Sequence, residues 1–254
     1  MAASVNKDPW IQTFPQHPDD NPSAFFLRLT ILAISNYCHG RKIVPPQCLK
    51  KRVIDGHELY TFEKEVEGGG KELMSAILQL KNVFATKTVS TVIFMVCGTS
   101  IDDPIESLYF NFSFDPVLQP SQFTKEETLA KIKEDTFKEL NHLYAIAQAL
   151  PSLSVPLLRF QLRYELNDSG KENAPMHESF VPIQVNPHVH KLYGVGADDL
   201  AIGMKLSRGE SIHVWLHSKL IKSISEIDSQ IAEYERTGLA DETISDMNST
   251  LNID

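Results

Sequence analysis

The stretch SVPLLRFQLRYEL, residues 154–166, decides how the rest of this chain is interpreted. From residue 158 onward, apolar and polar residues alternate, and a period of two predicts a β-strand that buries one face. The apolar positions are Leu158, Phe160, Leu162, Tyr164 and Leu166, and the polar positions are Arg159, Gln161, Arg163 and Glu165. The pattern therefore predicts a half-buried strand whose apolar set faces a core and whose polar set faces solvent.

A long polar segment follows this strand, where a short turn would be more usual. Residues 167–178, NDSGKENAPMHE, are interrupted by Gly and Pro, and short strand-like pieces return only at 189–195 and 200–206. If the strand lies at a sheet edge, its backbone groups invite a strand from a partner. If residues 180–206 pair with it instead, the edge is closed within the chain. The pattern alone leaves both interpretations open.

The remaining pattern predicts an α+β domain. Apolar residues at helical spacing predict helices over 23–40, 71–85 and 124–150, the last with a capping box at its start and Pro151 after its end. Apolar or alternating runs predict a strand hairpin over 89–97 and 108–114, and residues 49–62 fit either a short helix or a ribbon. Long helices packed on one antiparallel sheet define the predicted fold class.

Composition excludes several functions. The chain has a net charge of −9, and eight acidic residues stand against two basic ones after residue 221, which is unfavourable for direct contact with DNA phosphates. No run approaches the roughly 20 apolar residues that span a bilayer, and the N-terminus lacks the pattern of a secretory signal. The three cysteines fit no disulfide or zinc spacing, so we expect a reducing compartment.

Motifs for catalysis are weak. His188 and His190, with His213 and His217, are plausible metal-ligand pairs, but no HExxH motif or cysteine pair accompanies them. Residues 68–71, GGGK, lack the spacing of a phosphate-binding loop and are expected to form a flexible connector. No nucleophile elbow or kinase signature is present. These observations predict a protein that is not an enzyme and that needs no cofactor or metal.

Four segments together resemble the HORMA domain, over about residues 23–216. They are SAFFLRLTILAISNYCHGRKIVPP from residue 23, KELMSAILQLKNVFA from 71, VSTVIFMVCGTSIDDPIESLYFNFSFD from 89 and LPSLSVPLLRFQLRYEL from 150. The chain is most similar to the meiotic HORMA proteins of the chromosome axis, in particular to nematode paralogues. The resemblance implies an α+β fold in which three long helices pack on an antiparallel sheet that ends in a C-terminal "safety belt".

The resemblance also implies a function and a division of the chain. HORMA domains bind a short peptide, the closure motif, as a strand added beside the strand at 158–166, and the safety belt wraps over it. The implied binding residues are Leu158, Arg159, Phe160, Gln161, Leu162, Arg163, Tyr164, Val181, Ile183, Val185, Leu192 and Tyr193. The expected parts are a flexible arm (1–22), a core (23–166), the belt (167–216), a C-terminal helix (217–237) and a flexible acidic tail (238–254).

By the same resemblance, the expected partners are closure motifs in the tails of other axis proteins, an AAA+ remodelling ATPase, synaptonemal complex proteins and, indirectly, chromatin. The expected place is the meiotic chromosome in the nucleus, with a role in axis assembly, homologue pairing, synapsis and crossover control, and no contact with membranes. A HORMA adaptor of the spindle checkpoint, of translesion synthesis or of autophagy is the first alternative. A metal-dependent hydrolase that uses the four histidines is the second.

Overall fold

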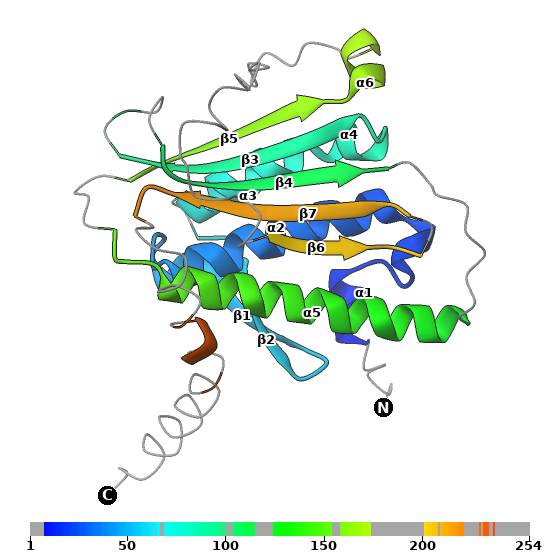
Figure 1. Ribbon diagram of the computed structural model, residues 1–254, viewed down its shortest axis with the longest axis horizontal. Coiled ribbons are helices and arrows are strands. Elements are labelled where there is room, and N and C mark those ends of the chain that lie inside the picture. Colours follow the sequence, from blue (N-terminus) through cyan, green and yellow to red (C-terminus); the bar gives the residue numbers. More distant parts are fainter. Residues whose placement is uncertain are drawn as a thin grey trace, which may run out of the picture.

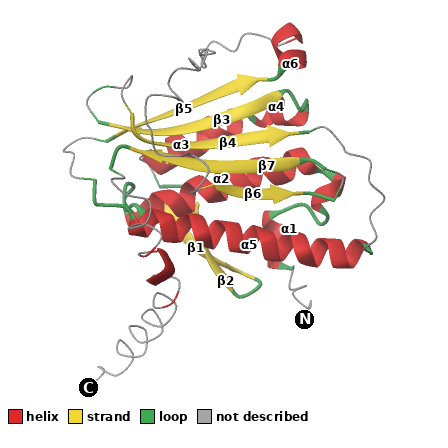
Figure 2. Ribbon diagram, viewed as in Figure 1, coloured by secondary structure: helices red, strands yellow, loops and turns green. Residues whose placement is uncertain are grey.

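The computed structural model describes residues 8–63, 65–66, 69–98, 100, 104–114, 124–153, 158–173, 201–207, 209–220, 229, 231–233 and 236. A five-stranded antiparallel sheet has the order β5-β3-β4-β7-β6, and β1 and β2 form a separate ribbon. Helices α2 and α3 lie behind the sheet, and α5 runs along its β6 side (Figures 1 and 2). This arrangement is the α+β fold that the sequence predicts.

The elements have the following bounds. The helices are α1 (Pro9–Thr13), η1 (Pro18–Asp20), α2 (Pro22–Gly40), η2 (Pro46–Cys48), α3 (Gly69–Gln79), α4 (Lys81–Ala85), α5 (Lys125–Ala149) and α6 (Asp168–Asn173). The strands are β1 (Leu49–Ile54), β2 (His57–Phe62), β3 (Val89–Cys97), β4 (Pro104–Ser113), β5 (Arg159–Leu166), β6 (Ala201–Lys205) and β7 (Ser211–Ser218). Within the described residues, no helix is long and apolar enough to cross a membrane.

Local signals in the sequence explain the two longest helices. Asn21 caps α2 by accepting a hydrogen bond from the amide of Ala24 at 3.1 Å. The capping box of α5 is present, with reciprocal bonds between Thr124 and Glu127 of 3.2 and 2.8 Å. The helix ends at Ala149, two residues before Pro151, as proline requires.

The prediction of a flexible arm over residues 1–22 is wrong from residue 8 onward. Helix α1 buries Trp10 completely, and its indole N–H donates to the carbonyl of Pro15 at 3.1 Å. Phe14 is 1% exposed, and its ring lies 5.3 Å from that of Phe25 on α2. The four prolines of this segment interrupt helical periodicity, so the sequence pattern did not reveal the helix. The two large aromatic side chains nevertheless need a core, and they pack into it.

The structure also settles three further segments of the chain. Residues 49–62 form the ribbon, closed by an Asp55–Gly56 turn in which both residues have positive φ, a strong hairpin signal. Gly70, which was expected in a flexible connector, lies inside α3, and a Cβ there would come within 2.9 Å of Cys48. Strand β7 continues to Ser218, so the helix expected from 217 starts later, and the described residues 229, 231–233 and 236 are helical.

An aromatic stack joins α2, β2 and α5. The ring of His39 lies 3.4 Å from that of Tyr60 and 5.6 Å from that of Tyr144, nearly parallel to the second. Partial burial, together with the cations Lys42 and Lys51, lowers the pKa of His39 below its usual value. Burial thus favours the neutral imidazole in this stack.

This stack predicts an acid-sensitive contribution to stability. Because the folded pKa of His39 is lower than the unfolded one, its contribution is present above about pH 6.5 and is lost as the pH falls through the folded pKa. A His39→Phe variant should lose less stability between pH 7.5 and pH 5.5 than the wild type does. Urea unfolding at the two pH values measures this, and equal losses would contradict the prediction.

Candidate functional site

The outer edge of β5 is the candidate site. β5 is the first strand in the order of the sheet, and among the described strands it pairs only with β3, antiparallel. The ribbon diagram shows it along the upper edge of the sheet, on the side opposite to β6 and β7 (Figure 1). The strand that the sequence singled out is therefore an edge strand within the described fold.

The hydrogen bonds of the sheet determine which backbone groups point out of this edge. Directions alternate from residue to residue along each strand. The amide of Lys219 donates to the carbonyl of Ile105 at 2.9 Å, so odd-numbered residues of β4 face β7 and even-numbered ones, such as Leu108, face β3. Phe94 lies opposite Leu108 and so faces β4. Leu162, opposite Phe94 on the other side, must then face away from β3.

Contacts near the end of β5 give the same result independently. The hydroxyl of Ser90 donates to the carbonyl of Glu165 at 3.3 Å, and the amide of Asn167 donates to the carbonyl of Thr88 at 2.8 Å. Both bonds place odd-numbered residues of this segment toward β3. The residues whose backbone N–H and C=O groups point away from β3 are therefore Phe160, Leu162 and Tyr164.

The side chains of β5 agree with the predicted alternation on one face. Four apolar side chains of this segment are half-buried and pack against the main core: Leu158, Phe160, Leu162 and Tyr164. Phe160 stacks on Phe94 of β3 with ring centroids 5.9 Å apart. These contacts hold the edge strand to the sheet without using the backbone groups that point outward.

The other face of β5 is less solvated than predicted. Arg159 is exposed, but Gln161 and Arg163 are half-buried. They lie opposite residues of β3 that form a second apolar cluster on this face, namely Ile93, Met95 and Cys97, each at most 5% exposed. Strand β3 is apolar on both faces, so the side chains of β5 that lie beside it are partly shielded from solvent. The other predicted binding residues, Val181, Ile183, Val185, Leu192 and Tyr193, lie outside the described residues.

The C-terminal hairpin of β6 and β7 occupies the opposite edge of the sheet. β7 pairs with β4 along its whole length, from Ser211 opposite Ser113 to Ser218 opposite Glu106. Helix α6 ends at Asn173 beside β5, and β6 begins at Ala201 on the far edge. The chain therefore leaves the sheet at one edge and re-enters it at the other, and the hairpin does not cover β5.

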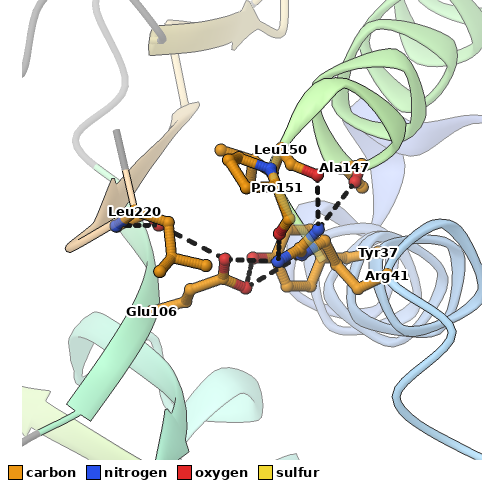
Figure 3. Close-up of polar contacts among 8 residues, drawn as sticks. Tyr37, Arg41, Glu106, Ala147, Leu150, Pro151 and Leu220 are labelled. Carbon is orange, nitrogen blue, oxygen red and sulfur yellow. Dashed lines mark hydrogen bonds and ion pairs between the residues drawn. The ribbon is translucent and has the colours of Figure 1, made fainter. Parts of the chain in front are cut away.

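A buried polar network at one end of the sheet was missed by the sequence analysis (Figure 3). Glu106 of β4 is fully buried and forms an ion pair with Arg41 at 2.8 Å. It also accepts hydrogen bonds from the hydroxyls of Tyr37 at 2.6 Å and Ser218 at 3.3 Å. Burial and the neighbouring carboxylate of Glu106 raise the pKa of Tyr37 well above its ordinary value. The network thus joins α2, β4 and the end of β7.

Arg41 extends the same network to the end of α5. Its guanidinium donates to the carbonyls of Leu150 at 3.0 Å and Pro151 at 2.8 Å, in addition to Glu106 (Figure 3). These carbonyls lie just beyond the helix, where no intrahelical donor reaches them. One signal could have found the network: Glu106 occupies a position in β4 that the alternation assigns to the core, and a buried charge requires a partner.

The structure describes two of the four histidines that the sequence offers as metal ligands. His213 and His217 lie on β7, four residues apart, which separates their Cα atoms by about 13 Å. No cluster of three potential ligands occurs among the described residues, and His188 and His190 lie outside them. Cys48 is buried.

Comparisons with known proteins bear on the fold. No protein-family model and no curated protein sequence matches the chain. The structure of C. elegans HTP-2 bound to the HIM-3 closure motif is similar, with a TM-score of 0.62 at 13% identity, over 85% of this chain and 99% of that one. C. elegans HTP-1 bound to HTP-3 motif-1 has a TM-score of 0.60 at 12% identity, over 85% and 98%.

A chain of the mitotic checkpoint complex is also similar. Its TM-score is 0.55 at 13% identity, over 79% of this chain and 99% of that chain. Because the identities are low, the shared property is the fold. The comparisons thus confirm that this chain has the HORMA-like α+β fold that the sequence resemblance implies, with helices packed on one antiparallel sheet.

Proposed function

We propose that this chain is a non-enzymatic adaptor that captures a short extended peptide, a closure motif, as a strand added to the outer edge of β5. The observation that carries the proposal is the outward direction of the backbone groups of Phe160, Leu162 and Tyr164. An edge strand with such groups is a template for β-augmentation. HTP-2 and HTP-1, which share the fold, are each bound to a closure motif or a numbered HTP-3 motif in their structures.

The proposal assigns residues 167–216 to the belt, whose part before β6 would close over the captured strand, with Val181, Ile183, Val185, Leu192 and Tyr193 as contacts. Two observations support this assignment. The chain leaves β5 through α6, and it returns to the sheet as β6 on the opposite edge. A segment fixed at both ends across the sheet would slow peptide release more than it would speed binding. Hence we expect slow dissociation to be the kinetic signature of capture.

The charge near the edge suggests what the peptide carries. Arg159 is exposed at the start of β5, and Arg163 lies on the same face four residues later. A peptide strand aligned with β5 would place alternate side chains beside these two guanidinium groups, which pair well with carboxylates. We expect captured motifs to hold an acidic residue at such a position.

In this proposal the adaptor acts on the meiotic chromosome axis, in the nucleus. Its partners would be closure motifs in the tails of other axis proteins, an AAA+ remodelling ATPase and synaptonemal complex proteins, with chromatin reached indirectly. It would support axis assembly, pairing, synapsis and crossover control. A checkpoint adaptor is the second candidate, and the similarity to a chain of the mitotic checkpoint complex supports it.

Fluorescence anisotropy with labelled peptides tests the proposal. The full chain is mixed with the HIM-3 closure motif, with HTP-3 motif-1, and with a scrambled version of each as the matched control. We expect saturable binding to one motif with slow dissociation, and at least tenfold weaker binding to its scramble. The titration is repeated after the chain has been unfolded and refolded with peptide present. Refolding gives the peptide access to the edge of β5 even if that edge was occupied before. Failure to bind either motif in both formats would contradict the proposed function.

A further inference from the structure

A carboxylate near the N-terminus holds the turn of the C-terminal hairpin. The backbone amide of Ser207 donates to Oδ1 of Asp19 at 3.1 Å, and the hydroxyl of Ser207 donates to Oδ2 at 2.6 Å. Ser207 is exposed and lies in the turn between β6 and β7, which also contains Gly209 with a φ of +101°. We call this pair of hydrogen bonds the Asp19–Ser207 clasp.

The carboxylate side of the clasp is fixed in place. Asp19 lies in η1 between Pro18, which is buried, and Asp20, which forms an ion pair with Lys125 of α5 at 2.8 Å. The same N-terminal segment is anchored by Trp10, which is 0% exposed. Asp19 therefore cannot move far from the hairpin without disturbing contacts to the core and to α5.

We propose that Ser207 is a phosphorylation site whose modification opens the clasp. The Ser207 oxygen attacks the γ-phosphorus of a nucleoside triphosphate on a protein kinase. The bond from that phosphorus to the β–γ bridging oxygen breaks, the nucleoside diphosphate leaves, and the hydroxyl proton passes to the kinase base. Ser207 is exposed, and Lys205 and Arg208 lie near it in the sequence.

The chemistry of the clasp makes it sensitive to this change. The hydroxyl is the donor of its shorter bond, and a phosphate replaces that donor with acceptors and about two negative charges. These charges would stand within a few ångströms of the Asp19 carboxylate, which is a like charge. Phosphorylation thus replaces the attraction between Ser207 and Asp19 with a repulsion. The turn between β6 and β7 should therefore separate from the N-terminal segment. The inference rests on the clasp alone and does not require the proposed peptide capture.

Hydrogen exchange measures the effect. The full chain is prepared with phosphoserine incorporated at position 207 and, as the matched control, with phosphoserine at Ser169, an exposed position on α6 far along the chain. We expect the amides of β6 and β7 to exchange about tenfold faster with phosphoserine at 207, and unchanged with phosphoserine at 169. Asp19→Asn should remove most of the acceleration, because it removes the opposing charge.

Two outcomes would overturn the inference. One is equal exchange in β6 and β7 for the two phosphoserine proteins. The other is the absence of phosphate on Ser207 peptides when the protein is isolated from its own cells and its peptides are examined by mass spectrometry. The exchange experiment contains no closure-motif peptide, so its failure would say nothing about capture, and failure of capture would leave this result standing.

Discussion

A proline in place of Tyr164 should weaken capture of a closure-motif peptide by at least about thirtyfold while the domain stays folded. The backbone of residue 164 points away from β3, so a proline there removes a donor from the outer edge of β5 and none from its pairing with β3. A carbonyl of the captured strand would then lack its donor. Leaving such a buried group unsatisfied costs about 2–3 kcal/mol, which corresponds to roughly 30–150-fold in affinity.

Two control variants separate the loss of the backbone N–H from the loss of the aromatic ring and from a loss of stability. Tyr164→Thr also removes the aromatic ring but keeps the N–H, so it should bind peptide within about fivefold of the wild type. Arg163→Pro removes an N–H that faces β3 and should lower the melting temperature instead. Anisotropy measures the affinity for the peptide, and thermal unfolding measures the melting temperature. Equal affinities of Tyr164→Pro and Tyr164→Thr would mean that no strand pairs with this edge.

Periodicity predicted those parts of the fold in which one surface faces the core. The alternation in β5 assigned Phe160 and Leu162 to the core correctly, and the capping box placed the start of α5 at its observed residue. These signals are local, because the buried face and the helix start each depend on residues close in sequence. The HORMA-like fold followed from the order of such segments.

Properties that depend on distant residues could not be predicted in the same way. The edge position of β5 depends on the hairpin of β6 and β7 pairing with β4, a choice of partner that no local pattern contains. The burial of Trp10 depends on contacts such as that with Phe137 of α5, whose ring lies 5.9 Å away. The half-burial of Gln161 likewise reflects its neighbour Met95 on β3. Long-range packing overrides local composition in all three.

The position of the hairpin links the fold to the candidate site. With β6 and β7 on the β4 side, β5 stays at the opposite edge of the described sheet, and the backbone groups of Phe160, Leu162 and Tyr164 point away from β3. Both the Asp19–Ser207 clasp and the Glu106–Ser218 contact hold this hairpin, one at each end. Changes that release the hairpin are therefore expected to alter the strand order that places β5 at the edge.

Removing both partners of the buried ion pair should cost less stability than the sum of the two single removals. Glu106→Leu leaves the Arg41 guanidinium, 3% exposed, without its carboxylate, and Arg41→Met leaves the carboxylate without its cation. Each single change should lower the free energy of unfolding by about 3–5 kcal/mol. The double variant leaves no buried charge, so its loss should fall short of the sum by about 2 kcal/mol or more.

Urea unfolding of the four proteins gives the coupling energy, and Lys125→Met, which breaks the exposed pair with Asp20, is the control and should cost at most about 1 kcal/mol. Strictly additive losses would show that Arg41 and Glu106 contribute independently. A residual cost in the double variant is expected even so, because the carbonyls of Leu150 and Pro151 and the hydroxyl of Tyr37 lose their partners. That residual separates the two tasks of Arg41: neutralising Glu106, and closing the end of α5 from which the chain continues toward β5.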